Sequence, residues 1–477
     1  MASGLKGSAE FLFNAGCNHL AKGDSRAAEA AFRRLLTQSP NHAEALANLG
    51  LVLDQQEAWE EAEVCYRRAA SLAPEYPQVH LNLGALMTAR RRLDEAETAY
   101  RQALALEASA DAWTGLGAVA ACRQLDGAAE ACYRQALRHD GQHASARFNP
   151  SYILLRHGCF EEGWECFEAR PAGRDLMTRF NGPRWTGDDL SGRAVVVAGE
   201  GGYGDVIQFC RYGRQLRARG ARWVAMVCQA ALVPLLRRVH GLDEVCPDTA
   251  PLAWQDADVW TPLMSLPGLC GTRLADVPAP VPYVVADTQA VAHWDAALPA
   301  GFRVGLVWRG NPRFHNDEAR SLPNLATLAP VLSHPEVRFV SLQTGPAATE
   351  ATVPGIARAL GGQLGDFAAT AAVVANLDLV ISVDTAVAHL AGAMGRPCWV
   401  LLPGYLPDWR WLIDREDSPW YPSLRLFRQP RDGSWATVVE EVAAALEALV
   451  GAGPAARLQP TGVNPARQPR AGGNTNR

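Results

Sequence analysis

Two separated segments of the chain place a carboxylate beside small residues, in patterns suited to proton transfer and phosphate binding. The first contains Gly201, Gly202 and Gly204 directly before Asp205, and an apolar stretch precedes it. Glycines permit the tight turn that joins a strand to a helix. A carboxylate at the mouth of such a turn can act as a general base, and we expect Asp205 to face a cleft between two lobes.

The glycine turn also satisfies the G-x-G-x-x-G pattern of dinucleotide-binding proteins. Those proteins hold the ribose with an acidic residue at the end of the second strand. Here the second predicted strand, RWVAMVCQ, ends in Gln229. The sequence therefore favours a turn that needs glycine for its backbone angles, and it predicts no cofactor.

The second segment, LDLVISVDTAVAHLAGAMG, is a predicted strand followed by a predicted helix. The strand delivers Asp384, Thr385 and Ala386 to the helix N-terminus, where free amides and the helix dipole attract anions. His389 follows Thr385 by one turn and lies on the same side. Together these residues predict a seat for a diphosphate, although Asp384 alone is as well explained as the N-cap of the helix.

Strands and helices alternate along the chain around both segments. One series begins at RAVVVAGEGG and a second begins at GFRVGLVWRG. Such alternation indicates parallel sheets, and two series indicate two Rossmann-type lobes that face a cleft. We expect the first lobe over residues 182–300 and the second over 301–450. Residues 451–477 are rich in Gly, Pro, Arg, Asn and Gln and are expected to be disordered.

The first third of the chain is an internal repeat. Gly16, Gly50, Gly84 and Gly117 recur at spacings of 34, 34 and 33 residues, and Phe32, Tyr66, Tyr100 and Tyr133 keep the same phase. The pattern resembles the tetratricopeptide repeat, a helix-turn-helix unit in which small residues let helices approach. We expect the aromatic side chain to fill the gap to the next unit.

We expect four units over residues 9–147, and a degenerate fifth unit with the connection over 148–181. The array offers a groove for a peptide or protein, or it only stiffens or dimerises the chain.

The glycine turn GYGDVIQF and the distant DTAVAHLAGAMGRP together resemble the bacterial heptosyltransferase group of glycosyltransferases. The resemblance implies a GT-B fold, with an acceptor-side first lobe and a nucleotide-sugar-side second lobe. It also implies that Asp205 deprotonates the acceptor and that Asp384, Thr385, Ala386 and His389 bind the donor diphosphate. The fold class is therefore α plus α/β: a helical solenoid of tetratricopeptide repeats followed by a GT-B-like pair of Rossmann-type lobes.

The chain departs from the family pattern at two points. Ala386 stands where the family usually has glycine, and no lysine follows Lys22. The missing lysines exclude a Walker-type phosphate loop and a pyridoxal Schiff base from the lobes. Arginines in VWRGNPRFHNDEARSLP, namely Arg309, Arg313 or Arg320, are the expected replacements beside the phosphates.

A tryptophan-rich segment, LPDWRWLIDREDSPWYP, follows the second motif. Trp409, Trp411 and Trp420 stand near Arg410, and such rings either stack on a base or sugar or pack the lobes together. The D-x-D sequence at Asp256 and Asp258 begins a predicted strand and is interpreted as structural, so no metal is expected.

Composition limits the classes of function. Apolar residues make up 48% of the chain and charged residues 20%, which is typical of a folded globular protein. A formal net charge of −5 does not favour nucleic-acid binding. The 11 cysteines form no C-x-x-C pair and are expected to be reduced thiols of a cytoplasmic protein. No apolar run is long enough for a transmembrane segment.

The sequence thus predicts an enzyme, a glycosyltransferase that moves a sugar from a nucleotide-diphosphate donor without a metal and with inversion. The acceptor is expected to be a protein or peptide recruited by the repeats. The alternative is a non-catalytic repeat scaffold with a degenerate transferase domain, which the missing lysine and Ala386 motivate.

Overall fold

The computed structural model divides the chain into two compact units, Met1–Ile153 and Leu154–Arg477. It describes residues 2–171, 176, 179, 180, 182–249, 257–278, 280–314, 316–430 and 433–452. The helical unit therefore extends to Ile153, somewhat beyond the expected end of the four repeats. Most of the tail expected to be disordered lies outside the described residues, as does Asp256, the first residue of the D-x-D sequence.

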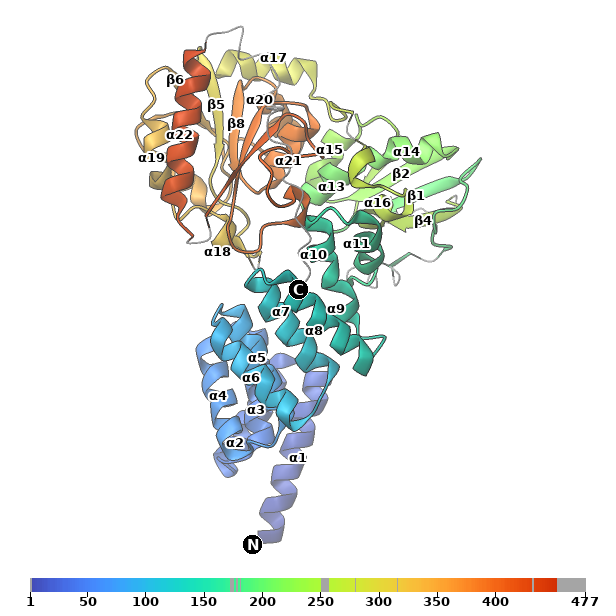
Figure 1. Ribbon diagram of the computed structural model, residues 1–477, viewed down its shortest axis with the longest axis vertical. Helices are drawn as coiled ribbons and strands as arrows, with labels where there is room; N and C mark the ends of the chain where they lie inside the picture. Colours follow the sequence, from blue (N-terminus) through green and yellow to red (C-terminus); the bar gives the residue numbers. More distant parts are fainter. Residues whose placement is uncertain are drawn as a thin grey trace, which may run out of the picture. The chain divides into compact units, whose positions relative to one another are not determined.

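The first unit is built from pairs of antiparallel helices (Figure 1). In order, its helices are α1 Ala2–Ala21, α2 Ser25–Gln38, α3 Ala43–Gln55, α4 Trp59–Leu72, α5 Pro77–Ala89, α6 Leu93–Leu106, α7 Ala110–Cys122, α8 Asp126–His139, α9 Ala144–Phe148 and α10 Pro150–Arg156, the last of which continues into the second unit.

Each repeat turns at a residue in the left-handed backbone region. Glu57, Arg91 and Gln124 have φ values of 62°, 57° and 58°. Gly23 occupies the same place in the first repeat, and Gly158 occupies it in the segment expected to be a degenerate fifth unit. The turn therefore keeps the repeat period even where the surrounding sequence does not.

The period of glycines and aromatics has a direct packing cause. A Cβ added to Gly16, Gly50 or Gly117 would lie 2.5–2.7 Å from the ring of Phe32, Tyr66 or Tyr133. Each of these rings therefore packs on the glycine of its own helix pair. Whether these three rings also fill the gap to the next unit, as the sequence predicts, stays a prediction. The ring of Tyr100 lies between Gly84 of its own pair and Gly115 of the next.

The second unit contains two parallel sheets among its described residues. One has the strand order β3-β2-β1-β4, and the other has the order β10-β9-β8-β5-β6-β7. Read from its other edge, the second sheet has the order of the doubly wound nucleotide-binding fold. Its switch point lies between β5 and β8, whose carboxyl ends are adjacent.

The strands are β1 Ala194–Ala198, β2 Trp223–Cys228, β3 Glu244–Pro247, β4 Val259–Pro262, β5 Phe302–Val307, β6 Val337–Ser341, β7 Ile356–Ala359, β8 Leu379–Val383, β9 Cys398–Leu402 and β10 Leu424–Arg428. The α-helices are α11 Phe160–Phe167, α13 Tyr203–Phe209, α14 Gly213–Ala218, α15 Val233–Leu236, α16 Leu266–Leu269, α17 Thr288–Ala297, α18 Asp317–Arg320, α19 Ala329–Leu332, α20 Phe367–Val374, α21 Ala386–Ala393 and α22 Trp435–Gly451. Short 3₁₀ turns include η8, Trp409–Trp411.

Helices cover both faces of the second sheet, with α19 and α22 on one face and α20 and α21 on the other (Figure 1). Its strands are apolar because both faces are covered. All five residues of β8 and of β9 are buried. The fold expected from the sequence, repeats followed by parallel α/β lobes, is confirmed.

The chain crosses between the two lobes more than once. Helix α17, expected at the end of the first lobe, packs against α20 of the second. The segment that contains Trp409 and Trp420 then returns to Phe209 on α13, with ring centroids 6.5 and 5.9 Å away. A single boundary at residue 300 therefore does not separate the lobes, because each contributes a segment to the other.

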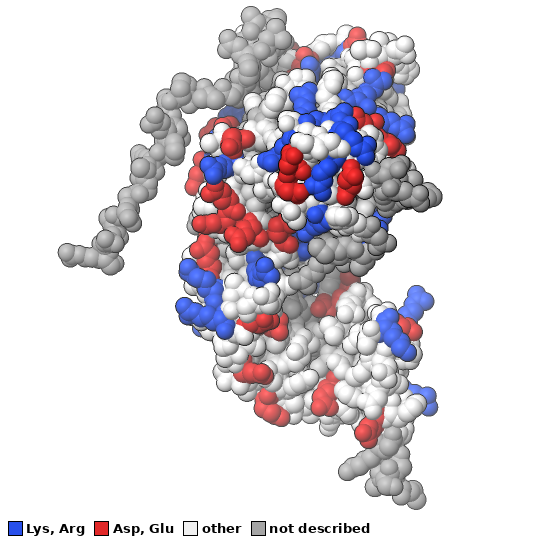
Figure 2. All heavy atoms as spheres, turned by 90° about the vertical axis from the view of Figure 1, so that its right-hand side faces the viewer, with Lys and Arg blue, Asp and Glu red and all other residues white. Residues whose placement is uncertain are grey.

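Acidic and basic side chains are mixed over the face shown in Figure 2. On the first lobe, Arg217, Arg222 and Arg238 each pair with an aspartate. No helix of the described residues is both long and apolar enough to cross a membrane.

Replacing Gly117 with alanine should destabilise the helix pair α7–α8 by about 1–3 kcal/mol, since the new methyl group overpacks against Tyr133. The matched control is Gly127→Ala in the same pair, where a Cβ meets nothing within 4 Å. There alanine should be neutral or stabilise by up to about 1 kcal/mol. Hydrogen exchange of α7 and α8 measures both changes, and equal effects would contradict the packing assignment.

Candidate active site

The two sequence segments meet where α13 packs on α21. A Cβ on Gly204 would lie 2.7 Å from Cδ2 of His389, so this position has to be glycine for the helices to approach so closely. The structure therefore brings the glycine turn of one lobe against the strand–helix junction of the other, as the sequence predicts.

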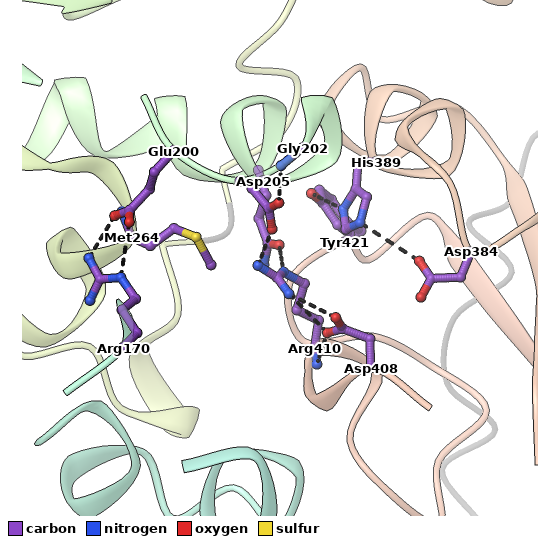
Figure 3. A network of polar contacts seen from close by, with 12 residues as sticks. Arg170, Glu200, Gly202, Asp205, Met264, Asp384, His389, Asp408, Arg410 and Tyr421 are labelled. Carbon is purple, nitrogen blue, oxygen red and sulfur yellow. Dashed lines mark hydrogen bonds and ion pairs between the residues drawn. The ribbon is translucent and has the colours of Figure 1, made fainter. Parts of the chain in front are cut away.

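Asp205 lies at the start of α13, and both of its carboxylate oxygens have partners (Figure 3). Its Oδ2 accepts a hydrogen bond of 2.7 Å from the amide of Gly202, which holds the turn. Gly201 has a φ of 75°, and a Cβ there would lie 2.4 Å from Oδ2. Glycine is therefore needed in this turn for two reasons: it allows the backbone angles, and it leaves room for the Asp205 carboxylate. Gln229, at the end of β2, donates a hydrogen bond to the carbonyl of Gly201.

The other oxygen of Asp205 pairs with the guanidinium of Arg410, from η8. Arg410 also donates to Oε1 of Gln208 at 2.6 Å and to both oxygens of Asp408 at 3.0 Å. Burial raises the pKa of the Asp205 carboxyl, and the charge of Arg410 opposes that shift. A carboxylate with a raised pKa is the stronger base.

Asp384 follows β8 and lies beside His389, with 3.9 Å between Asp384 Oδ1 and His389 Nε2 (Figure 3). The N-cap of α21 is Thr385, and no side chain caps that helix. The alternative that Asp384 is the N-cap is therefore wrong. Burial, with the nearby charge of Asp408, raises the pKa of Asp384 to about 6.

His389 is a buried, neutral imidazole. Burial lowers its pKa well below the ordinary value, and the charges of Arg410, Arg211 and Arg320 add to this. Its Nδ1 lies 3.0 Å from the hydroxyl of Tyr421. His389 can therefore offer a hydrogen bond to an anion but not a positive charge.

The arginines expected beside the phosphates lie in different surroundings. Arg309 donates to the carbonyls of Leu322 and Pro323 and so fixes its own loop. Arg313 is exposed. Arg320 pairs with Asp317 at 3.1 Å, and its charge acts on both Asp384 and His389. Of these three, Arg320 is the one whose charge reaches the site.

The three tryptophans are core residues. Trp409 is 1% exposed, and Trp411 and Trp420 are fully buried. Trp411 stacks on His389, and Trp420 stacks on Phe160 at 5.9 Å. The expectation that these rings stack on a base or sugar is replaced by the packing alternative, because the rings are buried against other side chains.

Sequence reasoning missed the polar partners that hold these residues together. Gln208 lies one turn after Gly204, and Asp408 precedes the first tryptophan of the segment. The alternation of Asp408, Trp409, Arg410 and Trp411 was the available signal, because an arginine among buried aromatics requires a buried anion.

A second buried ion pair lies at the end of β1. Arg170 and Glu200 are 4% and 3% exposed at their side chains and lie 2.6 Å apart. Glu200 also accepts from the amide of Met264, and Arg170 donates to Ser265 (Figure 3). This pair ties the connection before the first lobe to the end of that lobe's first strand. Asp258 accepts from the amide of Ala194 at 2.6 Å, as expected for a structural residue.

Two protein-family models match the chain, one in each of its two units. Residues 13–78 match the tetratricopeptide repeat family, and residues 343–401 match glycosyltransferase family 9 (heptosyltransferase). The second match includes Asp384 and His389 but not Asp205.

A curated relative is Protein FlbA of Caulobacter vibrioides, 32% identical over 335 residues, which are 64% of this chain and 55% of the relative. The chain thus spans about half the length of that relative. Among solved structures, PilF of Pseudomonas aeruginosa is 19% identical over 36% of this chain and 82% of its own, with a TM-score of 0.32. A thermophilic tetratricopeptide repeat protein of Thermus thermophilus is 21% identical over 36% and 96%, with the same TM-score.

Asp384→Asn should stabilise the protein near neutral pH and lose that advantage in acid. The native carboxyl has a pKa of about 6, against about 3.9 in an unfolded chain. The native state therefore binds the extra proton between these values, and wild-type stability falls as the pH rises through that window. Relative to pH 4, the variant should gain about 1–3 kcal/mol at pH 7.5, measured by urea unfolding.

The control for this pH effect is Asp366→Asn. Asp366 caps α20 by accepting from the amide of Ala369 at 2.8 Å, and asparagine caps equally well. This variant should change the stability only slightly. A pH-independent change for Asp384→Asn would contradict the assignment of a buried carboxyl whose pKa is raised.

Proposed function

We propose that this protein, a tetratricopeptide-repeat chain that carries a glycosyltransferase family 9 (heptosyltransferase) domain, transfers a sugar from a nucleotide-diphosphate donor by direct displacement. The observation that carries the proposal is the meeting of Asp205 with the strand–helix junction of Asp384 and His389, through the contact of Gly204 with His389. This contact supports the proposal that a base and an anion seat lie on opposite sides of one junction in a GT-B-like fold.

The donor diphosphate would lie at the N-terminus of α21. The first amides of that helix have no side-chain cap, and such amides bind anions well. Thr385, Ala386 and His389 offer hydrogen bonds there, and Arg320 contributes positive charge. Burial raises the pKa of Asp384 to about 6. Its carboxyl group is suited to form a hydrogen bond with a hydroxyl group of the donor.

In the reaction, Asp205 takes the proton of the acceptor hydroxyl while that oxygen attacks the anomeric carbon. The bond from this carbon to the phosphate oxygen breaks, and the nucleoside diphosphate leaves with the electron pair. One displacement inverts the anomeric centre. The amides and cations at α21 stabilise the charge that develops on the leaving group, so no step requires a metal.

We further propose that the repeats form a binding surface for a polypeptide acceptor. A groove that binds a remote part of the acceptor raises the effective concentration of the reacting hydroxyl at the cleft.

Asp205→Asn should lower sugar transfer by roughly 10²-fold or more, the scale of losing a general base. Release of nucleoside diphosphate from ADP-, GDP- and UDP-sugars by the purified chain provides the assay. Asp189→Asn, an exposed aspartate of the same lobe, is the matched control and should leave the rate unchanged. Wild-type turnover by Asp205→Asn would remove Asp205 from the mechanism.

Deleting residues 1–147 should abolish transfer to a polypeptide acceptor while slow donor hydrolysis survives. The connection has to be retained, because Arg170 and Trp164 are buried against the first lobe and η8. Donor hydrolysis reports that the lobes still fold. Unchanged transfer to the native acceptor would instead assign acceptor recognition to the lobes.

A further inference from the structure

The guanidinium of Arg410 is the cation that contacts the proposed base directly. Its side chain is 6% exposed, and its partners are Asp205 and Gln208 on α13 and Asp408 on its own segment. It also lies 4.4 Å from the ring centroid of Trp409. Its charge acts on Asp205, on Asp384 and on His389. Arg410 thus acts electrostatically on both halves of the site.

Several carboxylates gather near this point. Asp205 and Asp408 both bond to Arg410, and Asp408 in turn raises the pKa of Asp384. A diphosphate that enters the site meets this negative charge and needs a cation to offset it. The lobes contain no lysine, Arg309 is held by backbone carbonyls, and Arg320 pairs with Asp317.

The segment that carries Arg410 is held in an unfavourable backbone. Leu406, Leu412 and Asp414 flank η8 with φ values of 44°, 51° and 54°. Side chains with a Cβ rarely adopt this region, and such strain gathers where a segment can change state.

A nearby donor is also left without a partner. Nε2 of Gln208 is buried and has no hydrogen bond among the described residues, while Oε1 of the same amide accepts from Arg410. An unpaired buried donor costs free energy, so the arrangement around Arg410 is not fully satisfied without ligand.

We propose that Arg410 changes partners when the donor binds. Without ligand its guanidinium pairs with Asp205 and Asp408; with donor bound it turns to the diphosphate and releases the oxygen of Asp205 that then accepts the acceptor's proton. Donor binding therefore precedes activation of the base. This inference rests on the proposed function and adds Arg410 as the donor-binding residue that couples the two steps.

The test measures binding of ADP, GDP, UDP and inorganic pyrophosphate to the full chain by titration calorimetry. Arg410→Gln should weaken the nucleoside diphosphate that the wild type binds, and pyrophosphate, by about 10- to 100-fold, the scale of losing a hydrogen bond between two charged groups. Asp408→Asn should tighten both several-fold, because it removes a competing anion. Arg415→Gln is the matched control, since Arg415 lies in the same segment and pairs with Asp417 instead; its binding should be unchanged.

A purely structural arginine gives a different result. It predicts a lower melting temperature for Arg410→Gln and Asp408→Asn with no change in diphosphate affinity, and that outcome would overturn the inference. If Arg410→Gln does not fold, Asp408→Asn decides, because unchanged or weaker binding by that variant also overturns it. If the wild type binds none of the four probes, the proposed function itself fails.

The pH profile gives a second readout. In the free enzyme, removing the charge of Arg410 lets the pKa of Asp205 rise further. The acid limb of kcat/KM for the donor, which reports the free enzyme, should therefore move to higher pH in Arg410→Gln. An unmoved acid limb would show that Arg410 does not act on the base.

Discussion

The burial of one guanidinium between two lobes constrains the rest of the site. A buried charge is tolerated only when its partners are in place, and removing one partner leaves an uncompensated charge that costs several kcal/mol. Arg410 takes its partners from α13 and from its own loop. The positions of Asp205 and of η8 are therefore fixed by one another, although they lie far apart in the sequence.

Packing around this ion pair also holds α13 and η8 in position. Gly204 lets α13 approach His389, and Arg211 donates to the carbonyl of Trp420 and the hydroxyl of Tyr283. The tryptophans that follow the second motif fill the space between lobes. Aromatic rings thus form the apolar surroundings in which the charges of Asp205, Asp384 and Arg410 act strongly, because little water screens them.

Local patterns predicted a large part of this molecule. The 34-residue period predicted the helix pairs because each glycine needs a ring at a fixed distance along the chain. Strand and helix alternation predicted the parallel sheets, and the expected cleft between two lobes agrees with the contact between the two motifs. The direction in which a side chain points is set by tertiary packing, and a local sequence pattern does not predict that packing. The sequence therefore left open whether Trp411 stacks on a ligand or packs the lobes, and the structure shows that it packs on His389. Gln208 was missed because its neighbours in sequence do not reveal Arg410.

The central claim is that the glycine turn and the strand–helix junction form one nucleotide-diphosphate site. Hydrogen–deuterium exchange of the full chain, with and without a saturating nucleoside diphosphate, tests it most directly. We predict slower exchange in residues 199–209 and 384–394 together, with the repeats unchanged. Protection of one segment alone, or of neither while the ligand is bound, would contradict the account.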